Sequence, residues 1–406
     1  MVENTKKNKI GLSAIFSCYI AVIPILEYYR SPLGGFNSAT FLAMAFLALF
    51  FALLILKDRD KRIVFDGRML PVWLYIVFMT FNIIVCFSLY NYSYNWDNLS
   101  SFVRFIVLFF SLLVFGHNYF DFSIAIKFLE KFLVVCAVLI FIQDFLYIFL
   151  HVGINMTVPG LLMNASDAVY AGRPGGLYME PAHYSQSALL YICVYLFSKN
   201  SELNLSRKSF ILVILGIIAS GSGQGYAFLG IIYCIWLVYN LRVKNLSPKK
   251  FVGILLSIVG VILLCSILIQ IPFVQTAVSR FISEDGTLGG KALQGRTYTN
   301  IIFKELNQTE KTFGIGFGFV KSLTDGYVNS LYTHLIQCGY LSLIPLGYIF
   351  IYVLTKGQTF ARVFIILYAI MVCFAGVATP MGLCFYLLFL LFSKSLSDKD
   401  SDKEKL

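Results

Sequence analysis

Apolar runs of about twenty residues, long enough to cross a membrane as helices, recur from one end of the chain to the other. A helix rises about 1.5 Å per residue, so a run of that length covers the ~30 Å hydrocarbon layer. Charged residues make up 13% of the chain, about half of what a soluble domain carries. Too little polar surface would remain to face water. The pattern predicts an all-α, polytopic membrane protein with about twelve transmembrane helices.

We expect these helices to form one integral membrane domain over residues 1–406. The stretch 209–241 is interrupted by Ser220-Gly221-Ser222-Gly223-Gln224-Gly225. Glycine inside a helix costs about 1 kcal/mol relative to alanine, so two short helices meeting at a break are expected. Broken helices in membranes line cavities rather than lipid. The expected spans are 10–29, 36–56, 70–91, 102–120, 128–150, 183–198, 209–222, 224–241, 250–271, 327–355, 360–376 and 380–393.

The distribution of basic residues predicts the orientation of these helices. If the N-terminus is inside, most of the 32 Lys and Arg residues fall in inner segments, as the positive-inside rule requires. The C-terminus is then also inside, and residues 394–406 form a disordered cytoplasmic tail. Two larger loops, 151–182 and 272–326, face the extracytoplasmic side, and short helices are expected in them. Orientation therefore explains the net charge of +11, and nucleic-acid binding is not expected.

The nine cysteines all lie inside apolar runs, without a CxxC motif or a Cys/His cluster. They are interpreted as small packing residues. A disulfide framework, a metal site or a cofactor is not expected.

The segment from Gly172 to His183 carries the most informative group of polar residues. Pro181 suits the first turn of a helix, where its missing N–H does no harm. Glu180 would then precede that turn, either as a helix cap or, paired with His183 three residues later, as a general base. Arg173 precedes a Pro-Gly-Gly turn, and a guanidinium beside a helix N-terminus suits a phosphate.

The second outer loop contains Arg296 and a glycine string, Gly314-Ile315-Gly316-Phe317-Gly318. Because no strand precedes the string, a dinucleotide site is rejected and a lid or turn is expected. The next helix carries a polar stripe, which lines a cavity or forms interhelical hydrogen bonds. Its members are Asn329, Ser330, Thr333, His334 and Gln337.

Other ionisable residues lie in the outer halves of the expected spans, where burial is costly and function is a default hypothesis. Asp144 and His334 are the deeper ones, and for them a water-filled cavity is favoured. Glu27 lies near the headgroups, where pairing with Arg30 is the simpler interpretation.

Taken together, these features resemble the bacterial O-antigen polymerase and ligase superfamily. The shared pattern is an Arg…Gly…Glu-Pro segment before a middle helix, a Ser/Gly break, a long outer loop opening with Gly-Arg, and Gly-x-Gly before a polar-striped helix. The architecture covers nearly the whole chain. The motifs themselves are short.

The resemblance implies a metal-independent glycosyltransferase of the cytoplasmic (inner) membrane that acts on undecaprenyl-pyrophosphate-linked oligosaccharides at the extracytoplasmic face. The product would be O-antigen of lipopolysaccharide, or capsule. Glu180, His183 or His334 would activate the acceptor hydroxyl, and Arg173 and Arg296 would bind the leaving pyrophosphate. Asn329 is a further substrate-binding candidate. Membrane lipid and a chain-length regulator protein are the other expected partners.

Two alternatives remain beside polymerisation. An O-antigen ligase, which transfers glycan to lipid A–core, carries a His-Asn pair with a glycine ten residues past the Asn. Asn329 and Gly339 keep that spacing, but Val328 stands at the His position, which favours the polymerase. A flippase for lipid-linked oligosaccharides also fits twelve helices, although the long outer loops and the lack of two similar halves speak against it.

Overall fold

The computed structural model of the chain is helical throughout its regular structure. It describes residues 2–31, 37–57, 67–90, 96–154, 156–158, 161, 174–198, 203–241, 252, 259–260, 270, 298–316, 330–375 and 380–392. Within these ranges the strand-like pairing is limited to an isolated bridge between Arg30 and Asn37. The all-α prediction is confirmed for the described residues.

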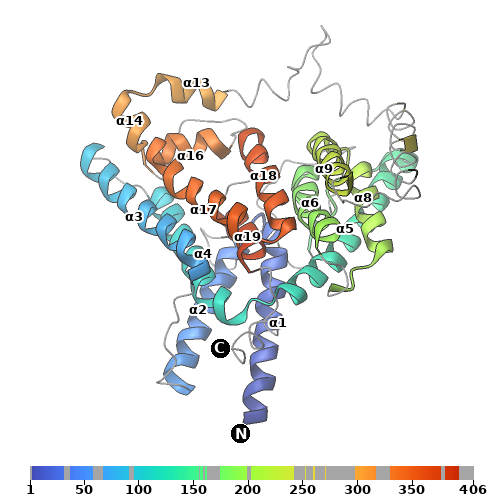
Figure 1. The fold of residues 1–406 in the computed structure, drawn as a ribbon, viewed down its shortest axis with the longest axis horizontal. Coiled ribbons are helices and arrows are strands. Elements are labelled where there is room, and N and C mark those ends of the chain that lie inside the picture. Colours follow the sequence, from blue (N-terminus) through green and yellow to red (C-terminus); the bar gives the residue numbers. More distant parts are fainter. Residues whose placement is uncertain are drawn as a thin grey trace. The chain divides into compact units, whose positions relative to one another are not determined.

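Figure 1 shows the helices in chain order. They are α1 (Val2–Leu26), α2 (Ser38–Lys57), α3 (Leu70–Tyr90), α4 (Trp96–Tyr119), α5 (Phe122–Leu150), α6 (Pro181–Phe197), α8 (Arg207–Ala219), α9 (Gly223–Leu241), α13 (Tyr298–Glu305), α14 (Gln308–Phe313), α16 (Ser330–Cys338), α17 (Leu343–Lys356), α18 (Thr359–Phe374) and α19 (Pro380–Leu391), with 3₁₀ turns η1 (Gly67–Met69) and η2 (Tyr340–Ser342). The helices α13 and α14 confirm that short helices occur within 272–326. The expected span 250–271 lies almost wholly outside the described residues.

One expected span is wrong as a continuous helix. The stretch 327–355 breaks at Gly339 into α16 and η2–α17, which meet at a bend of 116°. Gly339 has a φ of +68°, and a Cβ there would overlap the carbonyl group of Thr312. The chain turns here because a left-handed residue without a side chain lets the α14 segment approach.

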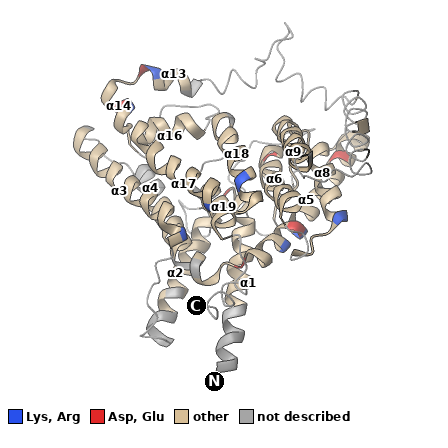
Figure 2. Cartoon of the chain, viewed as in Figure 1, with Lys and Arg blue, Asp and Glu red and all other residues tan. Residues whose placement is uncertain are grey.

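Two stretches are long and apolar enough to cross a membrane, among the residues that the structure describes. They are Gly67–Leu89 and Phe122–Leu150, and the bent pair Ser330–Cys338 with Tyr340–Lys356 makes a third if it counts as one span. Shorter apolar helices are Gly11–Leu26, Ser38–Leu49, Thr359–Cys373 and Gly382–Leu391. Lys, Arg, Asp and Glu are sparse along the described helices (Figure 2). The count of about twelve spans stays a prediction.

Helix α3 exposes an apolar stripe of the kind that suits lipid. Val77, Phe81 and Ile84 are each more than half exposed, and their spacing of three and four residues places them on one helical face. Leu74 and Phe87 extend the same stripe at either end. In water such a contiguous apolar face is unusual, so the stripe favours a bilayer around α3.

The chain divides into two compact units, and each is described by itself. The first unit comprises Met1–Leu129, Thr157–Ser166 and Gly295–Leu406, and the second comprises Glu130–Met156 and Asp167–Gln294. The single membrane domain, the two outer loops and the cytoplasmic tail stay predictions.

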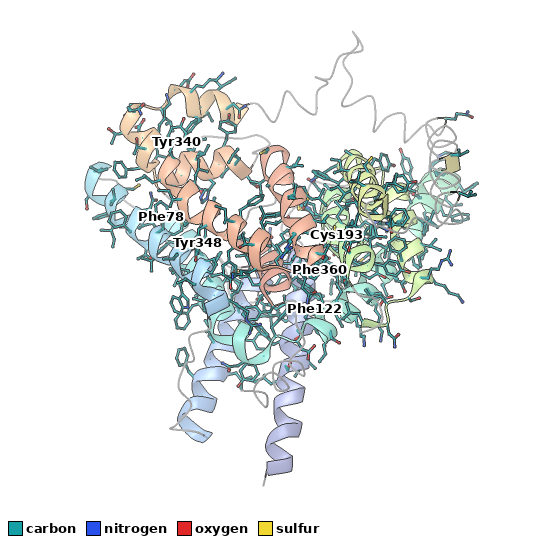
Figure 3. The ribbon with its side chains drawn as sticks, viewed as in Figure 1. Phe78, Phe122, Cys193, Tyr340, Tyr348 and Phe360 are labelled. Carbon is teal, nitrogen blue, oxygen red and sulfur yellow. The ribbon has the colours of Figure 1, made fainter. Side chains whose placement is uncertain are left out.

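In the first unit, α4 packs against α1, α2 and α19. Aromatic rings also pair between other helices of this unit. Phe16 meets Phe46 edge-on at a centroid distance of 5.6 Å. Phe122 stacks on Phe360 at 5.4 Å (Figure 3). Offset and edge-on ring pairs of this kind add to the stability gained from burial.

In the second unit, α6 packs against both α8 and α9. Two glycines allow this close approach. A Cβ at Gly216 of α8 would lie 2.5 Å from the Tyr184 hydroxyl, and a Cβ at Gly225 of α9 would lie 2.6 Å from Ser185 Oγ. Helix α6 is therefore closely packed against its neighbours, and Cys193 is fully buried (Figure 3).

Candidate functional site

Glu180 and Pro181 stand at the beginning of α6 in the second unit. The helix begins at Pro181, so the prediction that this proline occupies the first turn is confirmed. Glu180 takes the N-cap position with an extended backbone (φ −137°, ψ 151°), but its side chain makes no capping hydrogen bond. Its carboxylate therefore does not serve the backbone of α6 as a cap usually does.

Glu180 and His183 lie together on the first turn of α6. The His183 N–H donates to the Glu180 carbonyl oxygen at 3.1 Å, and the two side chains are close enough to interact electrostatically. Both residues are half-buried. The two residues of the predicted carboxylate–imidazole pair thus share one helical turn, and their pairing as a base stays a prediction. Such a pair can take a proton from a hydroxyl group or return one to it.

The turn before α6 is built on two glycines. The Tyr178 N–H donates to the Gly175 carbonyl oxygen at 3.1 Å, which closes the turn. Gly176 has a φ of +65°, and a Cβ there would lie 2.8 Å from the Cys136 carbonyl oxygen on α5. The glycine turn expected from the sequence is confirmed, and it presses directly on α5.

A glutamine on α5 holds this turn, and the sequence analysis missed it. Gln143 Oε1 accepts a hydrogen bond from the Gly176 N–H at 2.9 Å, and its Nε2 donates to the Ile154 carbonyl oxygen at 2.9 Å. One buried side chain thus ties the chain just after α5 to the chain just before α6. The available signal was an amide in an apolar run, next to Asp144.

Tyr184 sets the rotation of α6 about its axis. Its hydroxyl lies 3.3 Å from the Val213 carbonyl oxygen on α8 and 3.5 Å from the Leu133 carbonyl oxygen on α5, and the side chain is fully buried. Since Tyr184 follows His183 directly, this placement also determines the direction in which His183 leaves the helix.

The predicted break within 209–241 is confirmed. Helix α8 ends at Ala219, α9 begins at Gly223, and Gly221 between them has a φ of +62°. The Ile218 carbonyl oxygen near the end of α8 accepts from the Gly221 N–H at 3.3 Å and from the Tyr226 hydroxyl of α9 at 2.6 Å, so α9 adds a second bond at the end of α8.

His334 belongs to the first unit, on α16. Its ring stacks on Tyr75 of α3, with centroids 6.0 Å apart and planes at 20°. Its Nε2 is buried and has no hydrogen-bond partner within the part of the chain that the structure describes. The imidazole therefore carries a polar atom that the described protein groups do not use.

The described part of the glycine string, Gly314 to Gly316, lies against the end of α16. The Ile315 N–H donates to the Ile336 carbonyl oxygen at 2.8 Å, and the Gly316 N–H donates to the Gln337 carbonyl oxygen at 3.0 Å. Asn82 of α3 donates to the Phe313 carbonyl oxygen at 2.6 Å. Asn82 is a positioning residue that sequence reasoning missed, because its partners lie far away in the chain.

The remaining candidates divide into described and undescribed residues. Asp144 lies close enough to Tyr226 to interact electrostatically, and both belong to the second unit. Glu27 has the same relation to Tyr386 in the first unit. Three substrate-binding candidates, Arg173, Arg296 and Asn329, lie outside the described residues.

The structure thus brings Glu180 and His183 together and places His334 in the other unit. The first pair lies at the start of α6, near the hydrogen bonds of Gln143 and Tyr184. Comparison of the chain with protein-family models and with curated proteins gives no match.

Proposed function

We propose that the chain polymerises undecaprenyl-pyrophosphate-linked oligosaccharide repeat units into O-antigen or capsular polysaccharide, at the outer face of the cytoplasmic membrane. The observation that carries the proposal is the carboxylate of Glu180. It stands at the cap position of α6, makes no capping bond, and lies beside His183. A carboxylate beside an imidazole at a helix start is suited to acid–base work on a substrate.

The proposed reaction transfers a glycan from one lipid carrier to the next repeat unit. The acceptor hydroxyl oxygen attacks the anomeric carbon of the donor glycan, and a new C–O bond forms. The bond between that carbon and the pyrophosphate oxygen breaks, so the pyrophosphate leaves on its lipid. The hydroxyl proton passes to the Glu180–His183 pair, as a general base requires.

The departing pyrophosphate carries the charge that develops in the reaction, so the site needs cations or donors for it. Arg173 and Arg296 take that role in this proposal, and Asn329 contacts the sugar. Arginine suits the role because its planar guanidinium binds phosphate oxygens in pairs.

The proposed topology has about twelve spans with both termini inside. The start of α6 then faces the extracytoplasmic side, where lipid-linked repeat units are assembled. The apolar stripe of α3 and the two helices of spanning length support the membrane part of this proposal.

Replacement of Glu180 by glutamine tests the proposal most directly. Glu180→Gln keeps the size and hydrogen-bonding capacity of the side chain but removes its charge. In a strain that depends on this gene, we expect surface glycan reduced to single repeats on lipid A–core, seen as loss of the ladder on a gel. His183→Ala and His334→Ala, in the same assay, sort the other two candidate bases.

Glu130→Gln is the matched control, because Glu130 is a buried carboxylate of the same unit with a structural role. Its Oε1 accepts from the Ser206 N–H at 2.8 Å and from the Tyr191 hydroxyl at 3.3 Å, and an amide oxygen can accept both. A normal ladder in all three test variants would refute the proposed base. Accumulation of long undelivered chains on the carrier in the deletion strain would instead identify a ligase. Untransferred single repeats left on the inner face would identify a flippase.

A further inference from the structure

The polar face of α6 continues inward beyond Glu180 and His183. Gln186 and Ser187 follow His183 by three and four residues, so the three share one side of the helix. Gln186 lies five residues beyond Pro181, which is about 7.5 Å along the helix axis. Both Gln186 and Ser187 are buried. Glu180 and His183 therefore lie at the outer end of a longer polar face of α6.

Gln186 meets a second glutamine on α9. Gln186 Nε2 donates to Gln224 Oε1 at 3.2 Å. Gln224 is 7% exposed, and its own Nε2 is buried without a hydrogen-bond partner in the described ranges. Buried amide donors are nearly always paired, so an unpaired one in a native fold needs an explanation. A ligand acceptor is one such explanation.

The start of α9 adds backbone donors at the same place. Ser222 Oγ accepts from the Gly225 N–H at 3.1 Å, and the first helical bond runs from the Tyr226 N–H to the Ser222 carbonyl oxygen at 3.0 Å. The N–H groups of Gly223 and Gln224 precede that bond in the first turn. The positive end of the helix dipole reinforces them, and broken helices in membranes direct such ends at anionic groups.

The close approach of α9 to α6 keeps these donors in position. A Cβ at Gly225 would lie 2.6 Å from Ser185 Oγ and 2.7 Å from Ile217 Cγ2. The glycine therefore lets the beginning of α9 rest directly on α6, beside the Gln186–Gln224 bond. The start of α9 thus offers two backbone N–H groups, and Gln224 of the same helix turn adds an unpaired side-chain N–H.

We propose that the start of α9, with Gln224 and Gln186, binds a phosphoryl group of a lipid-linked substrate. The available groups are donors at a positive helix end, which select an anion rich in acceptor oxygens. The assignment to a lipid-linked phosphate rests on the proposed function. This assignment also fits the position of Gln186 and its partner Gln224, because Gln186 lies deeper along α6 than Glu180. The phosphate nearest the lipid chain is the deepest polar part of such a substrate.

Binding of undecaprenyl phosphate to the purified full chain in detergent tests this site. The uncharged undecaprenol and inorganic phosphate serve as comparison ligands. Gln224→Met replaces the amide by an apolar side chain of similar length, so the packing volume is retained, whereas the Nε2 donors and the Oε1 acceptor for Gln186 are lost. We expect the affinity for undecaprenyl phosphate to fall at least about tenfold, because a hydrogen bond to a charged group is lost. Gln308→Met, at the exposed start of α14, is the control and should bind normally.

Three results would overturn the site: equal binding of undecaprenol, unchanged affinity in a folded Gln224→Met variant, or binding of inorganic phosphate without binding of the lipid phosphate. Failure of the proposed function looks different. A chain that does not polymerise glycan, yet binds undecaprenyl phosphate in a Gln224-dependent way, would retain this site and lose the polymerase. An active polymerase that binds undecaprenyl phosphate equally well with and without Gln224 would retain the polymerase proposal and lose this site.

Discussion

The side-chain oxygen of Gln143 on α5 accepts a hydrogen bond from the backbone N–H of Gly176 at 2.9 Å, across the chain that separates α5 from α6. The same amide donates to the Ile154 carbonyl oxygen. The turn that leads to Glu180 is thus held by one buried residue of the preceding helix.

Replacement of Gln143 by leucine should therefore loosen this turn. Gln143→Leu leaves the buried Gly176 N–H without its partner, at a cost of about 1–3 kcal/mol, and also removes the donor to the Ile154 carbonyl oxygen. We expect a lower Tm of the purified protein and shorter glycan chains. Gln308→Leu, at an exposed site, is the control and should change neither. An unchanged Tm in Gln143→Leu would show that the two hydrogen bonds of Gln143 contribute nothing to stability.

Gly339→Ala should destabilise the bend between α16 and η2, which we call the Gly339 corner. Its φ of +68° costs an alanine about 1–2 kcal/mol, and the added Cβ also overlaps the Thr312 carbonyl group. Urea or thermal melts should show a loss of at least about 2 kcal/mol. Gly347 is the matched control, because a Cβ there meets nothing within 4 Å, and it lies inside α17. Gly347→Ala should be neutral or stabilising. Similar melts for both variants would contradict the requirement for glycine at position 339.

Two glycines of α9 offer a second matched comparison. Gly225→Ala places a methyl group against Ser185 and Ile217, whereas a Cβ at Gly230 meets nothing within 4 Å. We expect Gly225→Ala to push α9 away from α6, with reduced stability by about 1–3 kcal/mol and shorter glycan chains. Gly230→Ala should leave the chain length unchanged and should be neutral or stabilising. Equal chain lengths in the two variants would mean that the α6–α9 approach does not matter for activity.

Cysteine labelling tests the proposed orientation. In a background with the native cysteines replaced, cysteines at Ser166 and Thr287 should react with an impermeant reagent from outside. A cysteine at Ser247 should react only after permeabilisation, because 242–249 is expected on the inner side. Labelling of position 247 in intact cells would overturn either the helix count or the orientation.

The sequence predicted the local features well because local chemistry determines them. Pro181 begins a helix since its fixed φ and missing N–H suit a first turn. The break at Ser220–Gly225 follows from several glycines in a short stretch. These signals act within a few residues, and hydropathy adds the spacing of the apolar runs.

The bend at Gly339 and the hydrogen bond between Gln143 and Gly176 could not be predicted in the same way. The hydropathy of 327–355 continues past Gly339, and one glycine in a helix is only weakly unfavourable. What bends the chain is its contact with Thr312 and Asn82, which lie elsewhere in the sequence. Gln143 and Gly176 are likewise brought together only by the fold.

The corner at Gly339 also bears on ion coupling. In many ion-coupled transporters, carbonyl groups at the C-terminal end of a broken helix coordinate the driving cation. At the end of α16 the corresponding oxygens already accept protein hydrogen bonds. Ile336 and Gln337 accept from the glycine turn, and Cys338 accepts from Asn82 Nδ2 at 3.3 Å. A cation arriving there would share oxygens that already hold the glycine turn in place, so within the described residues the end of α16 serves to anchor that turn.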